Sequence, residues 1–296
     1  MIAFALSLFA RLMVAAATDD SSFCGFRRIP EDRPASASAF SRPGGILDRR
    51  APIELDMDRV WPPLEINVYV HLVAGSQTSS PAYHLKSTIV RKQFLLLNSH
   101  FAGANITFRQ RFLERRIYPV YAIVRDGSHQ AFIDMALALN QGTDSGNDTL
   151  NVYIVDELST TDGIRTGGQA FYPVNDPEKN LKESGVWIAV GTTPGGDRVN
   201  YNLGGTLTHE VGHWFGLPHT WADGSVDMYR CRPKRCKQCD LQRAMGTAPQ
   251  AYRSTGCPSE QPPDTCPGDS KPDAIHNHMG GNSEYVYSRI TTIKEK

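Results

Sequence analysis

Residues 206 to 219 read TLTHEVGHWFGLPH and follow the pattern H-E-x-x-H-x-x-G-x-x-H, which begins at His209. On a helix, residues four apart lie about 40° apart around the axis and about 6 Å along it, so His209 and His213 project from one face and can bind one ion. Glu210 is turned about 100° away, which leaves it outside the ion's ligands but able to reach a water bound there. This spacing is typical of zinc sites.

A third ligand requires the chain to leave the helix and turn back. Gly216 can adopt a positive φ and Pro218 prevents the helix from resuming, so we expect His219 to return to the metal. We also expect hydrophobic residues at four-residue spacing to anchor the helix in the core, namely Leu203, Leu207, Val211 and Phe215. The long motif fixes five residues, three of them His, so its chance occurrence in a chain of this length is on the order of 10⁻⁵.

Upstream of the motif, the hydrophobic pattern alternates between the periods of strands and helices. Strands are predicted over residues 64–73, 105–110, 150–155 and 185–191, and helices over residues 85–101 and 131–140. Strands that alternate with helices predict an α/β layer. The 296 residues are enough for one sizeable core with short appended segments.

The N-terminal part of the chain has the composition of a secretory leader. Residues 1–17 form an apolar run that ends in small residues, as a signal peptide does, and secretion to the extracellular space is expected. Residues 18–50 lack periodicity and are interpreted as a pro-segment, and residues 51–296 as the catalytic domain. The pair Arg49-Arg50 is either a processing site or a solvated pair in a linker. The sequons at Asn105 and Asn147 are candidate glycosylation sites.

Charge and cysteine usage limit the partners. Equal numbers of basic and acidic residues give zero formal net charge, so no long-range field attracts the chain to nucleic acid or to a membrane. Five of the six cysteines crowd into the last third, where disulfides are expected, and these candidates are Cys231, Cys236, Cys239, Cys257 and Cys266. The first three, interleaved with basic residues, leave a nucleic-acid-binding zinc knuckle as an alternative, which a count of two zinc ions per chain would support.

Longer stretches around the motif resemble a known family. The run from residue 185 to residue 221, GVWIAVGTTPGGDRVNYNLGGTLTHEVGHWFGLPHTW, is similar to the metzincins, and more narrowly to the pappalysin family and its fungal extracellular members. Downstream, Gly256-Cys257-Pro258, Asp264-Thr265-Cys266-Pro267 and the IHNHM sequence of residues 275–279 resemble that family's cysteine motifs and Met-turn.

The resemblance implies an α/β (α+β) metzincin-like fold, with a twisted mixed sheet and the active-site helix in an upper subdomain and a small, irregular, disulfide-bearing lower subdomain. It implies a secreted zinc metalloendopeptidase with one Zn²⁺ per chain and Met279 beneath the histidines. A zinc-bound water activated by Glu210 would hydrolyse peptide bonds. The strand at residues 185–191 would be the sheet edge that holds an extended protein or peptide substrate.

The chain also departs from the family pattern. Gly281 stands where the resemblance expects a tyrosine that helps to stabilise the transition state, and the 17 residues after Met279 offer little apolar material. We therefore expect a mobile segment from residue 221 onward, and a secreted zinc-binding relative with impaired catalysis is the alternative function. Cys24 is either a latency thiol that blocks the zinc or a disulfide partner.

Overall fold

The computed structural model describes residues 62–125, 130–142, 149–160, 163–173, 176, 182–221, 248, 250–251, 253, 263–266 and 271–284. The expected signal peptide, the pro-segment and Cys24 lie outside the described residues, as do Asn147, Cys231, Cys236, Cys239 and Cys257.

Helices and strands alternate along the described chain, as the hydrophobic pattern predicts. They are β1 (Leu64–Ala74), α1 (Pro81–His84), α2 (Ser87–Phe101), the 3-10 helix η2 (Ala102–Ala104), β2 (Ile106–Ile117), α3 (Pro119–Ala122), β3 (Ile123–Val124), α4 (Gln130–Leu139), β4 (Thr149–Val155), β5 (Glu157–Ser159), β6 (Arg165–Thr166), β7 (Gly168–Ala170), β8 (Val186–Ala189), the 3-10 helix η4 (Val190–Thr192) and α6 (Gly205–Trp214). The predicted bounds of β1, α2, α4 and β4 agree with these within two residues, whereas β2 continues seven residues beyond its predicted end.

The main sheet has the strand order β2-β1-β4-β8-β7. The first four strands run parallel to one another, and β7 runs antiparallel to β8, so the sheet is mixed, as expected. The expected edge strand is wrong: residues 186–189 form β8, an interior strand between β4 and β7, and β7 is the edge. Every residue of β8 is buried because it is covered on both faces and flanked on both sides.

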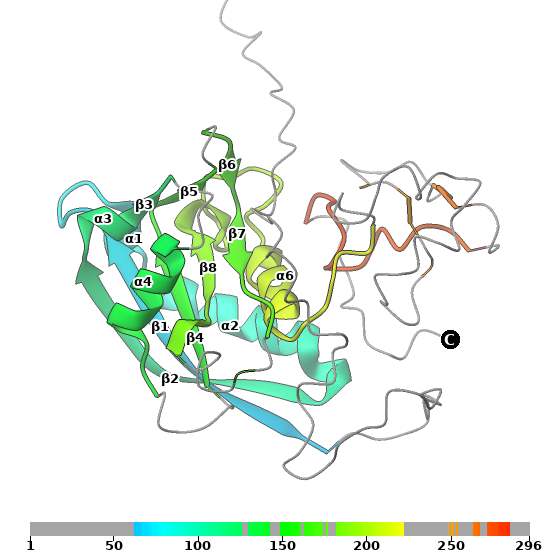
Figure 1. The fold of residues 1–296 in the computed structure, drawn as a ribbon, viewed down its shortest axis with the longest axis horizontal. Coiled ribbons are helices and arrows are strands. Elements are labelled where there is room, and N and C mark those ends of the chain that lie inside the picture. The colour runs from blue at the N-terminus through cyan, green and yellow to red at the C-terminus, as the bar shows by residue number, and fades with distance from the viewer. Residues whose placement is uncertain are drawn as a thin grey trace, which may run out of the picture.

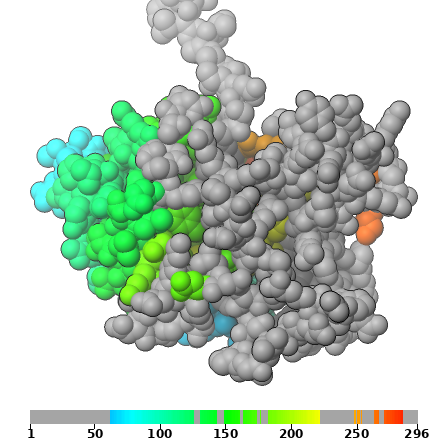
Figure 2. All heavy atoms as spheres, viewed as in Figure 1, coloured from blue at the N-terminus to red at the C-terminus, as the bar shows by residue number. Residues whose placement is uncertain are grey.

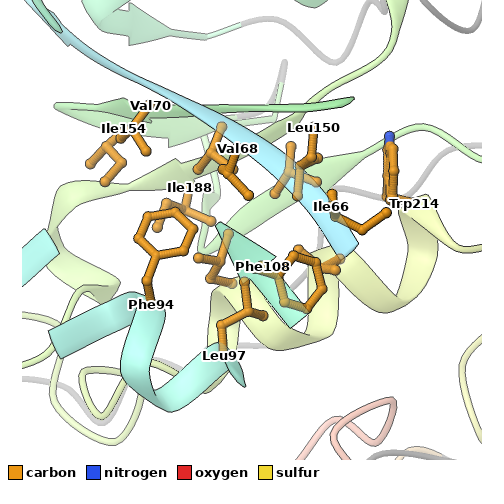
Figure 3. Close-up of a cluster of buried hydrophobic side chains, with 14 of the residues drawn as sticks. Ile66, Val68, Val70, Phe94, Leu97, Phe108, Leu150, Ile154, Ile188 and Trp214 are labelled. Carbon is orange, nitrogen blue, oxygen red and sulfur yellow. The ribbon is translucent and has the colours of Figure 1, made fainter. Parts of the chain in front are cut away.

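Side chains of the strands alternate between two cores on opposite faces of the sheet. Even-numbered residues of β1, β4 and β8 pack with α2 and α6, which are in contact with each other (Figure 1). Figure 3 shows this core, which contains Phe94 and Leu97 of α2 together with Val68 and Ile188 of the sheet. Tyr153 and Trp187 point to the other face, where they pack with α4. The sheet is therefore covered by α2 and α6 on one face and by α4 on the other, and α2 packs against α6.

Smaller features complete the fold. A second sheet has the order β3-β5-β6. In the space-filling view, the visible atoms coloured from cyan to green gather on the left side of the molecule (Figure 2). Among the described residues, no helix has the length and apolar content needed to cross a membrane.

Leu203 was expected to anchor α6, but it precedes the first residue of the helix and is exposed, whereas Leu207 and Val211 are fully buried.

Candidate metal centre

Two glycines set the limits of α6, the helix that carries the motif. The helix begins after Gly204, whose φ is 97°, and is followed by Gly216, whose φ is 90°. The amide of Gly216 donates to the His213 carbonyl and the amide of Leu217 donates to the Gly212 carbonyl, which is the Schellman arrangement of a helix end. A positive φ at Gly216 agrees with the sequence prediction. The chain therefore turns back immediately after the second histidine.

This turn brings three histidines together. Nε2 of His213 lies 3.0 Å from Nε2 of His209 and 3.1 Å from Nε2 of His219, and the third separation is 3.2 Å. All three side chains are buried. Ligands about 2.0–2.1 Å from a tetrahedral zinc ion would be about 3.3–3.4 Å apart, so the three nitrogens suit such an ion within a few tenths of an ångström. Among the described residues, these histidines are the one group of three or more possible ligands close enough to hold a metal.

The hydrogen bonds of two rings decide which nitrogen faces the centre. Nδ1 of His209 lies 2.6 Å from the carbonyl oxygen of His278, and Nδ1 of His213 lies 2.8 Å from that of Leu217. A carbonyl can only accept, so both Nδ1 atoms donate and both Nε2 atoms carry lone pairs toward the centre. Burial, and then the neighbouring His213 and His219, hold the pKa of His209 well below its usual range. A cation would relieve the repulsion between these lone pairs, which is the environment of a metal site.

Glu210 is fully buried on the same helix, beside the edge strand. Gly168 of β7 approaches it so closely that a Cβ at Gly168 would lie 2.6 Å from Cγ and 2.7 Å from Oε1 of Glu210. Four residues after Gly168, the ring of Tyr172 meets the ring of His213 edge-on, with 5.5 Å between the centroids. Sequence reasoning missed Gly168, because its significance comes from a contact across more than 40 residues.

Met279 lies against the middle of α6, between the two helical histidines. It is fully buried, and its sulfur occupies the space in which a Cβ of Gly212 would stand. Its backbone is fixed by Asn277, whose Oδ1 accepts from the Met279 amide, and by Thr220, whose amide donates to the Met279 carbonyl. The structure thus places Met279 against Gly212, which lies between His209 and His213 on α6.

Glu284 connects the segment after Met279 to the start of α6, where Gly204 provides no side-chain cap. Oε1 accepts from the amide and the hydroxyl of Thr206, and Oε2 accepts from the amide of Leu203. Burial raises the pKa of the Glu284 carboxyl, although these donors oppose the shift. Residues 279–284 are all buried, and the polar contacts of Glu284 hold this segment against α6 although it offers little apolar material. The expected mobility of the segment from residue 221 onward stays a prediction.

Glu284→Ala should lower the free energy of unfolding by about 2–4 kcal/mol, because it leaves buried amides at the helix start without an acceptor. Urea denaturation measures the effect. Glu65→Ala is the matched control: Glu65 pairs with Arg109 and Arg111 but is 44% exposed, so its loss should cost less than about 1 kcal/mol. Equal stability changes in the two variants would contradict the capping role.

Two other predicted site residues, Asn105 and Cys266, lie within the described part of the chain. Asn105 is exposed at the end of η2 with a φ of 58°. Cys266 is fully buried and disulfide-bonded, and its partner lies outside the described residues. Two further residues near the triad, Trp221 and Arg253, were not singled out as site residues in the sequence.

Comparisons with known proteins agree with this geometry. Residues 143–291 match the peptidase family model described as pregnancy-associated plasma protein-A. The chain is 34% identical over 256 residues to an extracellular metalloprotease of Sordaria macrospora, which covers 86% of this chain and 76% of the relative. It is 31% identical over 290 residues to an extracellular metalloprotease of Pyricularia oryzae, covering 97% and 91%.

Among solved structures, the fold is similar to that of Tannerella forsythia mature mirolysin in complex with a cleaved peptide. The TM-score is 0.58 at 20% identity, and the match covers 80% of this chain and 90% of that chain. At this identity the likeness shows the fold. The family model and the fungal relatives show that the chain belongs to the pappalysin family of peptidases and is a metalloendopeptidase.

Proposed function

We propose that this metalloendopeptidase is secreted, holds one zinc ion through His209, His213 and His219, and cleaves extended segments of proteins. The observation that carries the proposal is the approach of three buried Nε2 atoms to within 3.2 Å of one another. Zinc suits this donor set better than Mg²⁺ or Ca²⁺, which prefer oxygen ligands.

The roles of the residues follow from their positions. A zinc ion held here would act as a Lewis acid and lower the pKa of a water molecule to about 7. Glu210 accepts the proton of the attacking water and passes it to the leaving amine. Gly168 and the burial of Glu210 restrict the space that is open to its carboxylate. Met279 supports the helix from below through Gly212.

The edge strand supports the choice of substrate. Within the described residues, β7 pairs on one side with β8 and has no strand on its other side. A substrate segment could therefore add to β7 as a further strand, and it would do so beside Glu210. Such binding requires an extended chain, so unfolded segments and loops of proteins are the proposed substrates.

Secretion and processing complete the proposal. The relatives are named extracellular metalloproteases, and the disulfide at Cys266 suits an oxidising route. The apolar run of residues 1–17 would serve as the signal peptide and residues 18–50 as a pro-segment. Cys24 remains a candidate latency thiol, and Asn105 and Asn147 remain candidate glycosylation sites.

The test is an assay of the purified, processed protein on denatured casein, combined with a measurement of its zinc content. We expect about one zinc ion per chain, loss of hydrolysis on chelation, and recovery when zinc is returned. Two ions per chain would favour an additional zinc knuckle at Cys231, Cys236 and Cys239. Bound zinc without hydrolysis would favour the impaired relative.

Gly168→Ala should lower kcat by roughly 100-fold while zinc content stays near one, because the added methyl displaces the Glu210 carboxylate by about 1 Å. Hydrolysis of a quenched peptide substrate measures the effect. Gly103→Ala is the control, since a Cβ there would meet nothing within 4 Å. An unchanged kcat in Gly168→Ala would show that this contact does not position the carboxylate.

A further inference from the structure

The third histidine of the triad needs support of its own, because it lies outside α6. His209 and His213 are carried by the helix, and their Nδ1 atoms donate to backbone carbonyls. His219 follows the turn at Gly216, in a segment without regular structure. Its ring lies flat against the indole of Trp221, with 4.1 Å between the centroids and 13° between the planes. This stack is a direct restraint on the orientation of the imidazole.

Trp221 is itself held by a segment that is distant in sequence. It forms a parallel β-bridge with Gln250, and the hydroxyl of the adjacent Thr220 donates to Oε1 of Gln250. The guanidinium of Arg253 lies 5.8 Å from the centroid of the Trp221 ring. A cation at this distance attracts the ring electrostatically. The indole therefore stacks on the imidazole of His219 and lies within cation–π distance of the guanidinium of Arg253.

Arg253 takes its position from Gly281. Nε of Arg253 donates to the carbonyl of Gly281 at 3.3 Å. A Cβ at Gly281 would lie 2.7 Å from Cδ of Arg253 and even closer to Cγ and Nε. Gly281 therefore has to lack a side chain for the arginine to pass. The glycine that departs from the family pattern thus leaves the space that the arginine fills.

Arg253 also connects two segments of the chain that lie near the triad. Gly281 follows Met279 by two residues, so this arginine joins the Trp221 segment to the turn beneath α6.

We propose that Trp221 and Arg253 are positioning residues, which fix the imidazole of His219 for zinc through a His219–Trp221–Arg253 stack made possible by the absence of a side chain at Gly281. The proposal rests on the zinc site of the proposed function. Partners that orient metal ligands typically change metal affinity by 10–100-fold when they are mutated. Because the stack acts on one of three ligands, we expect the lower end of this range.

The experiment measures the zinc dissociation constant of the full chain by competition with a chromogenic chelator. Trp221→Leu, Arg253→Met and Gly281→Ala should each raise it about tenfold, whereas Trp221→Phe, which keeps an aromatic face, should stay within about twofold. The absorption spectrum of the cobalt-substituted protein should change in the first three variants, because it reports ligand geometry. Thermal unfolding of the metal-free forms identifies any variant that fails to fold.

A double variant decides whether the glycine acts through the arginine. If Gly281→Ala only displaces Arg253, it should add little to the effect of Arg253→Met, so the two effects should not be additive. Wild-type protein that binds no zinc would defeat the proposed function instead. Zinc binding in the wild type, with Arg253→Met and Gly281→Ala both within twofold of it, would overturn the stack as a positioning device.

Discussion

Glu210→Gln should lower kcat for peptide hydrolysis by about 10³-fold or more and leave about one zinc ion per chain. The amide has nearly the shape of the carboxylate and fits the same buried space beside Gly168, but it cannot accept the proton of the attacking water. Glu210→Ala should have an effect of similar size. Metal content remains because Glu210 is not one of the three groups that meet at the centre.

Glu114→Gln is the matched control for Glu210. Glu114 is also a largely buried glutamate, since 11% of its side chain is exposed, but it pairs with His71 and Arg116 away from the triad. Loss of the Glu114 charge should lower the stability of the protein and leave kcat within about twofold of the wild-type value. Near-normal hydrolysis by Glu210→Gln would refute the role of Glu210 as the base. If wild type and Glu210→Gln were equally inactive with zinc bound, the impaired relative would be the better description.

The approach of the three histidines to one another is predictable because their spacing is local. A helix places His209 and His213 on one face whatever surrounds it, and Gly216 and Pro218 bring the chain back within three residues. Most strands of the main sheet are predictable for a similar reason, since the even-numbered residues of β1 from Ile66 to Leu72 face one core. Short-range periodicity thus predicts both the site and most of the main elements.

The edge of the sheet is not predictable in this way. β7 has three residues, Gly168 to Ala170, and none of them is a β-branched residue that favours strands. The segment is a strand because it pairs with β8, which the local sequence does not reveal. One signal was present in the sequence: the run Val186–Ala189 is continuously apolar, which is typical of a strand buried on both faces. An edge strand with one solvated face would alternate.

The support of the site depends on contacts between distant segments. Glu284 caps α6 from 78 residues away, and Arg253 reaches Gly281 across 28 residues. Nothing in the local pattern around either residue indicates these partners. The sequence after Met279 offers little apolar material and so predicts a mobile segment, but it does not reveal that Glu284 and Gly281 make specific contacts with α6 and Arg253.

His213→Ala should abolish zinc binding at micromolar metal and with it all metal-dependent hydrolysis. The Nε2 of His213 is the nearest neighbour of both other Nε2 atoms, so its removal leaves two ligands where a zinc site needs at least three. The substitution also removes the hydrogen bond to the Leu217 carbonyl at the helix end, so we expect a moderate loss of stability in the metal-free protein as well.

His71→Ala separates the loss of a ligand from the loss of a buried histidine. His71 is also fully buried, and its ring nitrogens lie within hydrogen-bonding distance of Glu114 and Asn151 in the sheet. Its removal should lower the free energy of unfolding by about 2–4 kcal/mol, because it leaves these polar partners buried, yet zinc content should stay near one ion per chain. Metal analysis after dialysis, with circular dichroism on the same samples, distinguishes the two variants. Zinc retained by folded His213→Ala at the wild-type level would show that the triad is not the metal centre.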